Sequence, residues 1–403
     1  MKKLWVIAVV LLMAGSAYAE ERLNLSGSYR VRAWSWDNFS DLDSDNDGDE
    51  NQYWDQRFRL GAKLTVAEGI TANLRFDFAE AKWGAEFSEG WANPTEAKEI
   101  QVDRTYIKLD KEMYALSIGQ QWMGWGEMIA IDDQVTGIIA TIKTPVNITL
   151  AYAKLDEGAG LADGAADVNE DRDFYGVNAE MMMDEMSAGG FVGMITDGTP
   201  AEAEPMVVGL YAKAALAGLN VTGELDYFMG ENAATDYVGT QLYLDAKMDM
   251  EPAMVGASLF YAMGTDDSDE TQITAVMDAS GDFVPMDIGA GAFWTLIDPL
   301  GAALGGDVFE LTDNSGSMGL NVYSSCAFAE RFKVSGNLGY LTPAEDDVTD
   351  LDNVMIVNVG VEYAMATNTK LAAAYNYTMV DGDGAYDDAD AASVLGAMLQ
   401  LSF

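Results

Sequence analysis

The sequence predicts an all-β fold: a transmembrane antiparallel up-and-down β-barrel of about 18 strands, with 16 as the alternative count. Three observations support this prediction. Apolar and polar side chains alternate along most of the chain, short connections alternate with long polar ones, and no apolar run of 18 residues follows Met13. Because hydrophobic residues still make up 49% of the chain, we expect their side chains on one face of each strand.

The alternation is clearest between residues 70 and 78. Ile70, Leu74 and Phe78 fall on one face of this segment, whereas Arg75 and Asp77 fall on the other. Successive side chains of a strand point to opposite faces, so the segment has one apolar and one wet face. The same pattern recurs in segments 221–229, 371–379 and 395–403.

The connections give the strand count. Long polar loops are expected at residues 37–51, 81–98, 155–170 and 264–316, and short turns lie between them. The strands are predicted to begin near residues 22, 52, 70, 99, 113, 137, 147, 172, 187, 206, 220, 237, 253, 317, 332, 352, 369 and 392. An even count puts both termini on the periplasmic side. Residues 272–277 or 308–311 could add a hairpin or belong to a loop folded into the barrel.

A soluble all-β protein with one wet face is the alternative fold. It would need several sandwiches joined by linkers, because the apolar faces of so many strands must meet each other. The chain has only 8 prolines and no Gly/Ser-rich stretch that would serve as a linker. The alternation and loop lengths therefore favour the transmembrane barrel.

The N-terminal residues are expected to be an export signal. Lys2 and Lys3 carry positive charge, Leu4–Met13 is apolar, and Ala17–Ala19 is a small-residue cleavage site. We therefore expect residues 1–19 to be a cleaved signal peptide. Residues 20–403 are then a single barrel domain in the outer membrane of a Gram-negative cell.

Composition excludes several functional classes. Without Lys2 and Lys3 the chain has 20 basic and 66 acidic residues, a net charge of −46, which argues against nucleic-acid binding. The chain has no histidine, no Gly-x-Ser-x-Gly motif and no phosphate loop, so no enzyme activity is expected. Cys326 is the single cysteine and no Cys-x-x-Cys-His motif occurs, so no bound cofactor is expected.

Four stretches in the first third of the chain resemble large β-barrel porins of the alginate-export type: Leu25–Arg32, Asp55–Leu60, Asp103–Leu109 and Ser117–Gln121. The C-terminal Phe403 resembles the recognition signal of Gram-negative outer-membrane proteins. The resemblance implies a porin barrel that passes sugar acids. In that family the glycine matching Gly119 is often followed by a basic residue, and Gln120 stands there in this chain.

Period-two alternation predicts a basic wall inside the barrel. Of the 20 basic residues that follow the signal, 12 precede residue 112. Those expected to line the pore are Arg30, Arg32, Arg57, Arg59, Arg75, Arg104 and Lys108. Pairing the second and third strands about the turn at residues 67–69 puts Arg59 near Asp77. These charges either bind anionic or sugar-acid solutes, or merely solvate a water-filled wall with local ion pairs.

An acidic wall is predicted on the other side of the pore. Glu224 and Asp226 on the eleventh strand and Asp245 on the twelfth are expected to point inward. In an 18-strand circle the eleventh strand lies opposite the second. A basic wall facing an acidic wall would give a transverse electric field that orients polar solutes.

Aromatic residues near the outer loops allow two interpretations. Trp122 and Trp125 could stack on sugar faces, or they could belong to the aromatic girdle at the membrane interface. Trp54, Tyr363, Tyr375 and Phe403 are expected in the girdle.

The first loop is rich in carboxylates. Asp43, Asp45 and Asp47 match the first half of a calcium loop, but Trp54 stands where the final glutamate would be, so this is not an EF-hand. A solvated loop is the favoured interpretation, and weak calcium binding or bridging to lipopolysaccharide is the alternative.

The expected function is passive diffusion of small polar or charged solutes through an outer-membrane channel. The alternative is a structural or partner-holding barrel without an open pore, such as an adhesin or the sheath of an electron-transfer conduit. The expected partners are the lipid bilayer, lipopolysaccharide and the solutes. The sequence leaves open a monomer or a homo-oligomer such as a trimer.

Overall fold

The computed structural model describes residues 22–38, 42, 51–83, 101–156, 171–199, 201–278, 309, 311–312 and 314–403. The predicted signal peptide, residues 1–19, lies outside this part of the chain. None of the described residues forms a helix long and apolar enough to cross a membrane.

The described residues form strands and one short 3₁₀ helix. The first ten strands are β1 (Leu23–Asp37), β2 (Asn51–Ala67), β3 (Ile70–Lys82), β4 (Gln101–Asp110), β5 (Tyr114–Gly124), β6 (Ile131–Ile142), β7 (Val146–Asp156), β8 (Arg172–Met183), β9 (Met186–Asp197) and β10 (Glu204–Leu216). The remaining elements are β11 (Leu219–Glu231), β12 (Asp236–Met250), β13 (Ala253–Ala262), β14 (Glu270–Gln272), β15 (Met277–Asp278), β16 (Ser317–Ala329), β17 (Phe332–Thr342), β18 (Leu351–Ala366), β19 (Thr369–Gly382), η1 (Gly384–Tyr386) and β20 (Ala392–Ser402).

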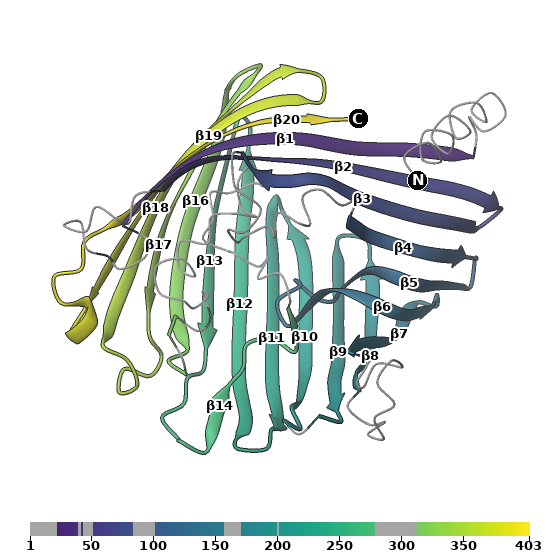
Figure 1. Ribbon diagram of the computed structural model, residues 1–403, viewed down its shortest axis with the longest axis horizontal. Helices are drawn as coiled ribbons and strands as arrows, with labels where there is room; N and C mark the ends of the chain where they lie inside the picture. Colours follow the sequence, from purple (N-terminus) through teal and green to yellow (C-terminus); the bar gives the residue numbers. More distant parts are fainter. Residues whose placement is uncertain are drawn as a thin grey trace.

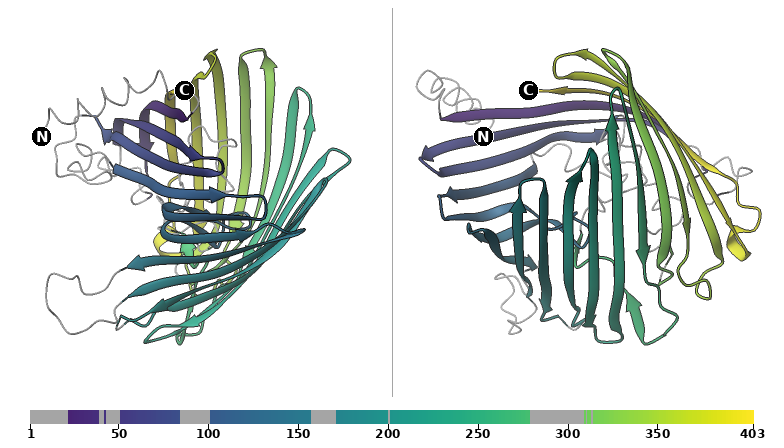
Figure 2. Two further views of the ribbon diagram at one scale, coloured as in Figure 1. Left: turned by 90° about the vertical axis from the view of Figure 1, so that its right-hand side faces the viewer. Right: turned by 180° about the vertical axis from the view of Figure 1, so that it is seen from behind.

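Eighteen of these strands form a closed antiparallel barrel. Each long strand pairs with the next along the chain, β13 pairs with β16, and β20 returns to pair with β1. Figure 1 shows β1 lying beside β20, and Figure 2 shows the curved wall from the side and from behind. The predicted count of 18 is confirmed, and closure leaves no unpaired strand edge in the membrane.

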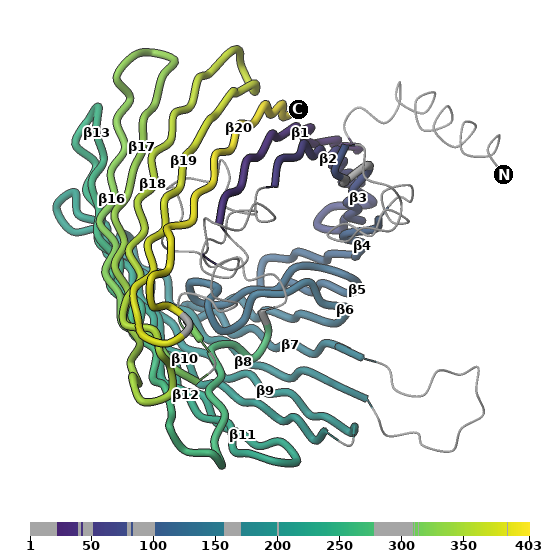
Figure 3. The backbone as a smooth tube through the Cα atoms, turned by 60° about the vertical axis from the view of Figure 1, so that its left-hand side comes forward, coloured from purple at the N-terminus to yellow at the C-terminus, as the bar shows by residue number. Residues whose placement is uncertain are grey.

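Strand tilt explains the appearance of the barrel. Strands β1–β3 run across the direction of β10–β13 in Figure 1, as expected for opposite walls whose strands tilt by about 40°. Figure 3 follows the wall from β4 through β12 to β20 and back to β1.

The strand boundaries agree with the predicted ones within about two residues at all but one position. The sixth strand was expected near residue 137, but β6 begins at Ile131. Residues 132–134 are Asp-Asp-Gln, and none of them has an apolar side chain for the outer face. The alternation of apolar and polar residues therefore becomes recognisable only further along the strand. These residues nevertheless pair with β5, and Asp132 lies opposite Gly124.

The two faces of the wall differ as the alternation predicts. Large apolar side chains such as Leu74, Ile107, Leu225 and Leu338 are exposed on the outer face, where lipid would cover them. At the long-loop end of β2 and β3, the rings of Trp54 and Trp83 stack with their centroids 5.3 Å apart. At the other end of the strands, Phe403 stacks on Phe58 at 6.1 Å.

Two segments fold into the barrel against the inner face. The first is the inner turn, residues 125–130, between β5 and β6. The second is the inner segment, residues 270–278, in which β14 pairs parallel to β12 and β15 pairs parallel to β6. The backbone N–H groups of Val276 and Met277 both donate to the Ala130 carbonyl, at 3.0 and 3.2 Å, so the two segments form one layer. For this region the sequence left open an added hairpin or a loop folded into the barrel. The described residues 270–278 form a loop folded into the barrel.

This inner layer explains where the buried side chains lie. One cluster joins Trp125, Ala130, Val276 and Met277 to Phe174 and other inward side chains of β6–β11. A second joins Ile129, Phe309 and Leu311 to the inner faces of β13 and β17–β20. The hydrophobic core therefore sits inside the barrel, between wall and loops.

Candidate channel lining

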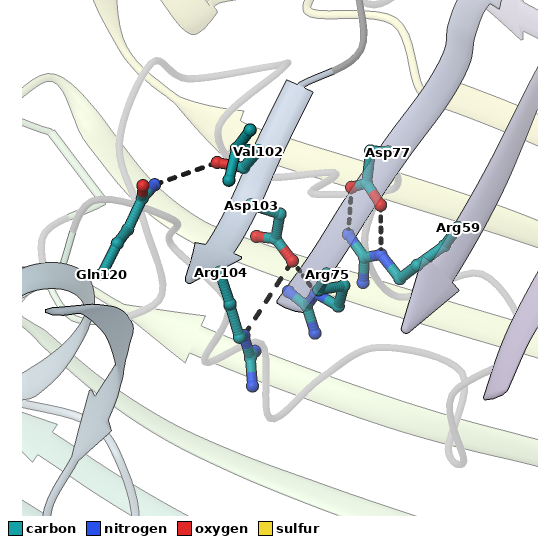
Figure 4. Close-up of polar contacts among 7 residues, drawn as sticks. All are labelled: Arg59, Arg75, Asp77, Val102, Asp103, Arg104 and Gln120. Atoms are coloured by element: carbon teal, nitrogen blue, oxygen red, sulfur yellow. Dashed lines mark hydrogen bonds and ion pairs between the residues drawn. The ribbon is translucent and has the colours of Figure 1, made fainter. Parts of the chain in front are cut away.

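Arg59 and Asp77 form a two-pronged ion pair on the inner face of β2 and β3. They lie directly opposite each other, as predicted from the turn at residues 67–69. The Arg59 guanidinium donates from Nε to Asp77 Oδ1 at 2.7 Å and from Nη2 to Oδ2 at 2.5 Å (Figure 4). Asp77 is buried whereas the Arg59 side chain is 25% exposed. The exposed part of the Arg59 side chain therefore belongs to a guanidinium whose charge Asp77 already compensates.

Arg75 and Arg104 share a single carboxylate. They lie opposite each other on β3 and β4, and the Nε atoms of both approach Oδ2 of Asp103, that of Arg104 at 3.9 Å (Figure 4). Their side chains are 23% and 29% exposed. Asp103 is therefore the carboxylate that lies within ion-pair distance of both guanidinium groups.

A β-bulge brings Asp103 into this group. In the β3–β4 ladder Arg75 pairs with Arg104 and Phe76 pairs with Val102, so Asp103 is the extra residue. Strict alternation puts Asp103 on the outer face, and the bulge turns its side chain inward beside Arg104. The sequence analysis missed Asp103 for this reason, because nothing in the local sequence marks the bulge.

The other predicted basic residues differ in accessibility. Arg30 lies opposite Arg57 on the inner face of β1 and β2. Arg32 is only 2% exposed, because its Nε donates to Asp55 at 2.8 Å and its guanidinium lies over the Trp34 ring. Arg32 points inward as expected, but it is part of the packed wall rather than of the accessible lining.

Lys108 lies at the turn end of β4. Its Nζ is 3.6 Å from the Asp110 carboxylate. Lys108 is therefore separated along the strand from Arg104 and the other arginines.

Arginine is the commonest charged residue among the described inward side chains of β1–β4. The arginines are Arg30, Arg32, Arg57, Arg59, Arg75 and Arg104, and the aspartates that the described part of the chain places among them are Asp55, Asp77 and Asp103.

The predicted acidic wall is covered by the inner layer. Glu224 and Asp226 are 2% and 0% exposed. The inner turn lies on Glu224, whose Oε2 accepts from the Glu127 N–H. Gln241 lies beside Asp226, donating from Nε2 to Asp226 Oδ2 at 3.2 Å and to the Thr274 carbonyl of the inner segment at 3.0 Å. Both carboxylates face inward, but loops that the alternation could not reveal separate them from the pore.

Asp245 is the accessible member of the predicted acidic group. It lies on β12 and is half-buried, and its Oδ1 accepts a hydrogen bond from the Tyr323 hydroxyl at 2.6 Å. It therefore lines the wall away from the inner turn.

The two candidate tryptophans have different surroundings. Trp125 is 6% exposed, and its ring packs between those of Phe174 and Phe191, with centroids 6.0 and 6.1 Å away. Its ring is therefore not available for stacking on a solute. Trp122 is half-buried, and the Arg104 guanidinium lies 5.4 Å from its ring centroid.

The candidate calcium ligands Asp43, Asp45 and Asp47 lie outside the described residues. Within the described ranges, no group of three or more His, Cys, Asp or Glu side chains could hold a metal ion.

Glu127 and Lys213 are lining residues that the sequence analysis missed. Lys213 Nζ on β10 is 2.8 Å from the Glu127 carboxylate on the inner turn. This ion pair joins the inner turn to β10, although the turn leaves the wall between β5 and β6. Only the fold of the loop brings these two residues together.

Comparison with known proteins agrees with this geometry. Residues 6–383 match the family model described as Gram-negative porin. No curated protein sequence matches the chain.

Solved structures give the same fold. OccK9 (OpdG) of Pseudomonas aeruginosa has a TM-score of 0.62 at 13% identity, covering 95% of this chain and 99% of that chain. The outer membrane protein opdK of Pseudomonas aeruginosa has a TM-score of 0.59 at 11% identity, covering 94% and 99%. A BenF-like porin from Pseudomonas fluorescens Pf-5 has a TM-score of 0.59 at 12% identity, covering 95% and 99%.

Proposed function

The chain belongs to the Gram-negative porin family, whose members are outer-membrane channels for small solutes, and we propose that this channel favours anionic solutes such as sugar acids. The observation that carries the proposal is the pair Arg75 and Arg104 sharing the single carboxylate of Asp103. A solute carboxylate that approaches these two guanidinium groups would supply the missing negative charge.

The accessibility of the arginines supports the same proposal. The side chains of Arg59, Arg75 and Arg104 are each about a quarter exposed, so part of each side chain remains reachable from the pore. Since they lie on three adjacent strands, a solute could pass from one to the next without leaving the positive wall.

Porins are typically channels without enzymatic activity, and the lining described above has no arrangement of nucleophile and base that would contradict this. We further propose that both termini face the periplasm, because the long connections and the short turns lie at opposite ends of the strands. Contacts with lipopolysaccharide at the long loops belong to the same proposal.

The test is the ion selectivity of a triple arginine variant, measured in planar bilayers. We expect Arg57→Ala/Arg59→Ala/Arg75→Ala to shift the reversal potential in a salt gradient toward cation preference, because positive charge leaves the lining. The control is Lys247→Ala, which removes positive charge from the inner face of β12 on the opposite wall and should change the reversal potential much less. An unchanged reversal potential in the triple variant contradicts the proposal.

A further inference from the structure

We propose that Glu224 is the positioning residue that holds the inner turn across the lumen and thereby sets the width of the channel. The proposal rests on the channel function proposed above and goes beyond it, because it concerns the shape of the pore rather than its charge preference. It starts from a carboxylate that is 2% exposed on the inner face of β11.

The contacts of the inner turn converge on β10 and β11. The Glu127 N–H donates to Glu224 Oε2, and the Glu127 carboxylate is 2.8 Å from Lys213 Nζ. The neighbouring residue is Gly126, with φ of +63°, and a Cβ atom there would clash with Glu224 Oε2. The backbone of the turn can approach the carboxylate this closely only because residue 126 is glycine.

The ends of the turn are anchored by packing. Trp125 is enclosed by Phe174 and Phe191 at one end. Ile129 at the other end belongs to the cluster that contains Phe260 and Leu311. The middle of the turn has no such apolar anchor, because Met128 is exposed. Its position over the pore therefore depends on the hydrogen bond to Glu224 and the ion pair to Lys213.

The burial of Glu224 makes this contact important. In a buried site the loss of the carboxyl oxygen leaves the Glu127 N–H without its acceptor, which costs more than the loss of an exposed hydrogen bond. Asp226, two residues along the same face, does not replace it, because Asp226 bonds to Gln241 and not to the turn.

The experiment compares Glu224→Ala with Glu224→Gln in the full-length protein. For Glu224→Ala we expect hydrogen exchange of the Glu127 amide to accelerate by about 10- to 100-fold, the equivalent of one buried hydrogen bond. We also expect a larger single-channel conductance with more open-channel noise. Glu224→Gln keeps a side-chain oxygen as acceptor and should restore most of the protection and the conductance.

The control is Glu362→Ala. Glu362 is an inward carboxylate on β18 paired with Lys370 at 3.2 Å, far along the chain from the inner turn. Its removal takes the same chemical group from the inner face but should leave exchange at Glu127 unchanged. If Glu224→Ala does not fold, Gly126→Ala is the second variant, because its Cβ would push the turn away from Glu224.

Unchanged exchange at Glu127 and unchanged conductance in either folded variant would overturn the proposal. Equal effects of Glu224→Ala and Glu362→Ala would also overturn it. Neither readout depends on anion preference, so failure here is distinguishable from failure of the arginine variants to change the reversal potential.

Discussion

Arg59 differs from Arg75 and Arg104 in having a carboxylate to itself. Asp77 accepts two hydrogen bonds from Arg59, whereas Asp103 is shared between the other two guanidinium groups. A compensated arginine contributes little net field, and a shared one contributes more. The field at the wall is therefore set by how the aspartates are distributed, as much as by the number of arginines.

We predict that Asp77→Asn raises the preference of the channel for anions. The substitution keeps the size of the side chain but removes the charge that compensates Arg59. It should also lower the free energy of unfolding by about 1–3 kcal/mol, since a hydrogen-bonded charge pair is lost. The reversal potential in a salt gradient and urea unfolding in lipid vesicles measure the two effects. A shift toward cations would show that Arg59 does not face the conducting path.

Asp103 also marks a limit of sequence reasoning at the residue scale. Alternation assigns each residue to a face only while the ladder is regular, and the bulge in β4 breaks it. The pairing of Arg59 with Asp77, by contrast, was predictable, because a short turn determines the register of the two strands that it joins.

The inner turn is the element whose packing matters most for the pore. Its contacts reach Phe174 on β8, Phe191 on β9 and Glu224 on β11, and neither β5 nor β6 pairs with any of these strands. The turn therefore braces the inner face of the wall.

We predict that Trp125→Ala destabilises the barrel by about 3–5 kcal/mol, because a large buried aromatic side chain leaves a cavity. The loss should appear as a lower midpoint in urea unfolding and as faster exchange of the amides of the inner turn. Trp122→Ala is the matched comparison, since Trp122 is only half-buried and should cost less. Equal losses would mean that the aromatic cluster does not anchor the turn.

Closure is the main feature at the scale of the whole molecule. Strands β1 and β20 come from opposite ends of the chain, and their ladder completes the barrel. The ladder ends where the Gly27 and Phe403 backbones exchange hydrogen bonds of 2.9 and 3.0 Å. Removing this last strand would expose the edges of both neighbours to lipid.

Deletion of residues 392–403 should therefore abolish the folded barrel. In gel electrophoresis without heating, we expect the full chain to migrate as a compact species and the truncated chain to migrate only as the unfolded one. Phe403→Ala is the milder variant, which should fold with reduced stability because its ring contact with Phe58 is lost. A compact truncated chain would show that closure by β20 is dispensable.

The purified full-length protein should conduct ions in a planar bilayer without any partner. An open pore passes current, whereas a barrel that serves only as a structural sheath is silent. The measurement is the single-channel current at fixed voltage, with the buffer detergent alone as control. Silence at all voltages would favour the structural alternative.

The sequence by itself determined the wall: eighteen strands, their two faces and the concentration of arginine in the first four. It could do so because period-two alternation and turn lengths are local properties, recorded wherever one face meets lipid and the other meets water. The tertiary structure alone decided what covers that wall. Glu224 and Asp226 face inward by alternation, yet the inner turn and the inner segment bury them. Those contacts join residues 97 and 33 positions apart, and long-range packing of a loop leaves no periodic trace in its own sequence.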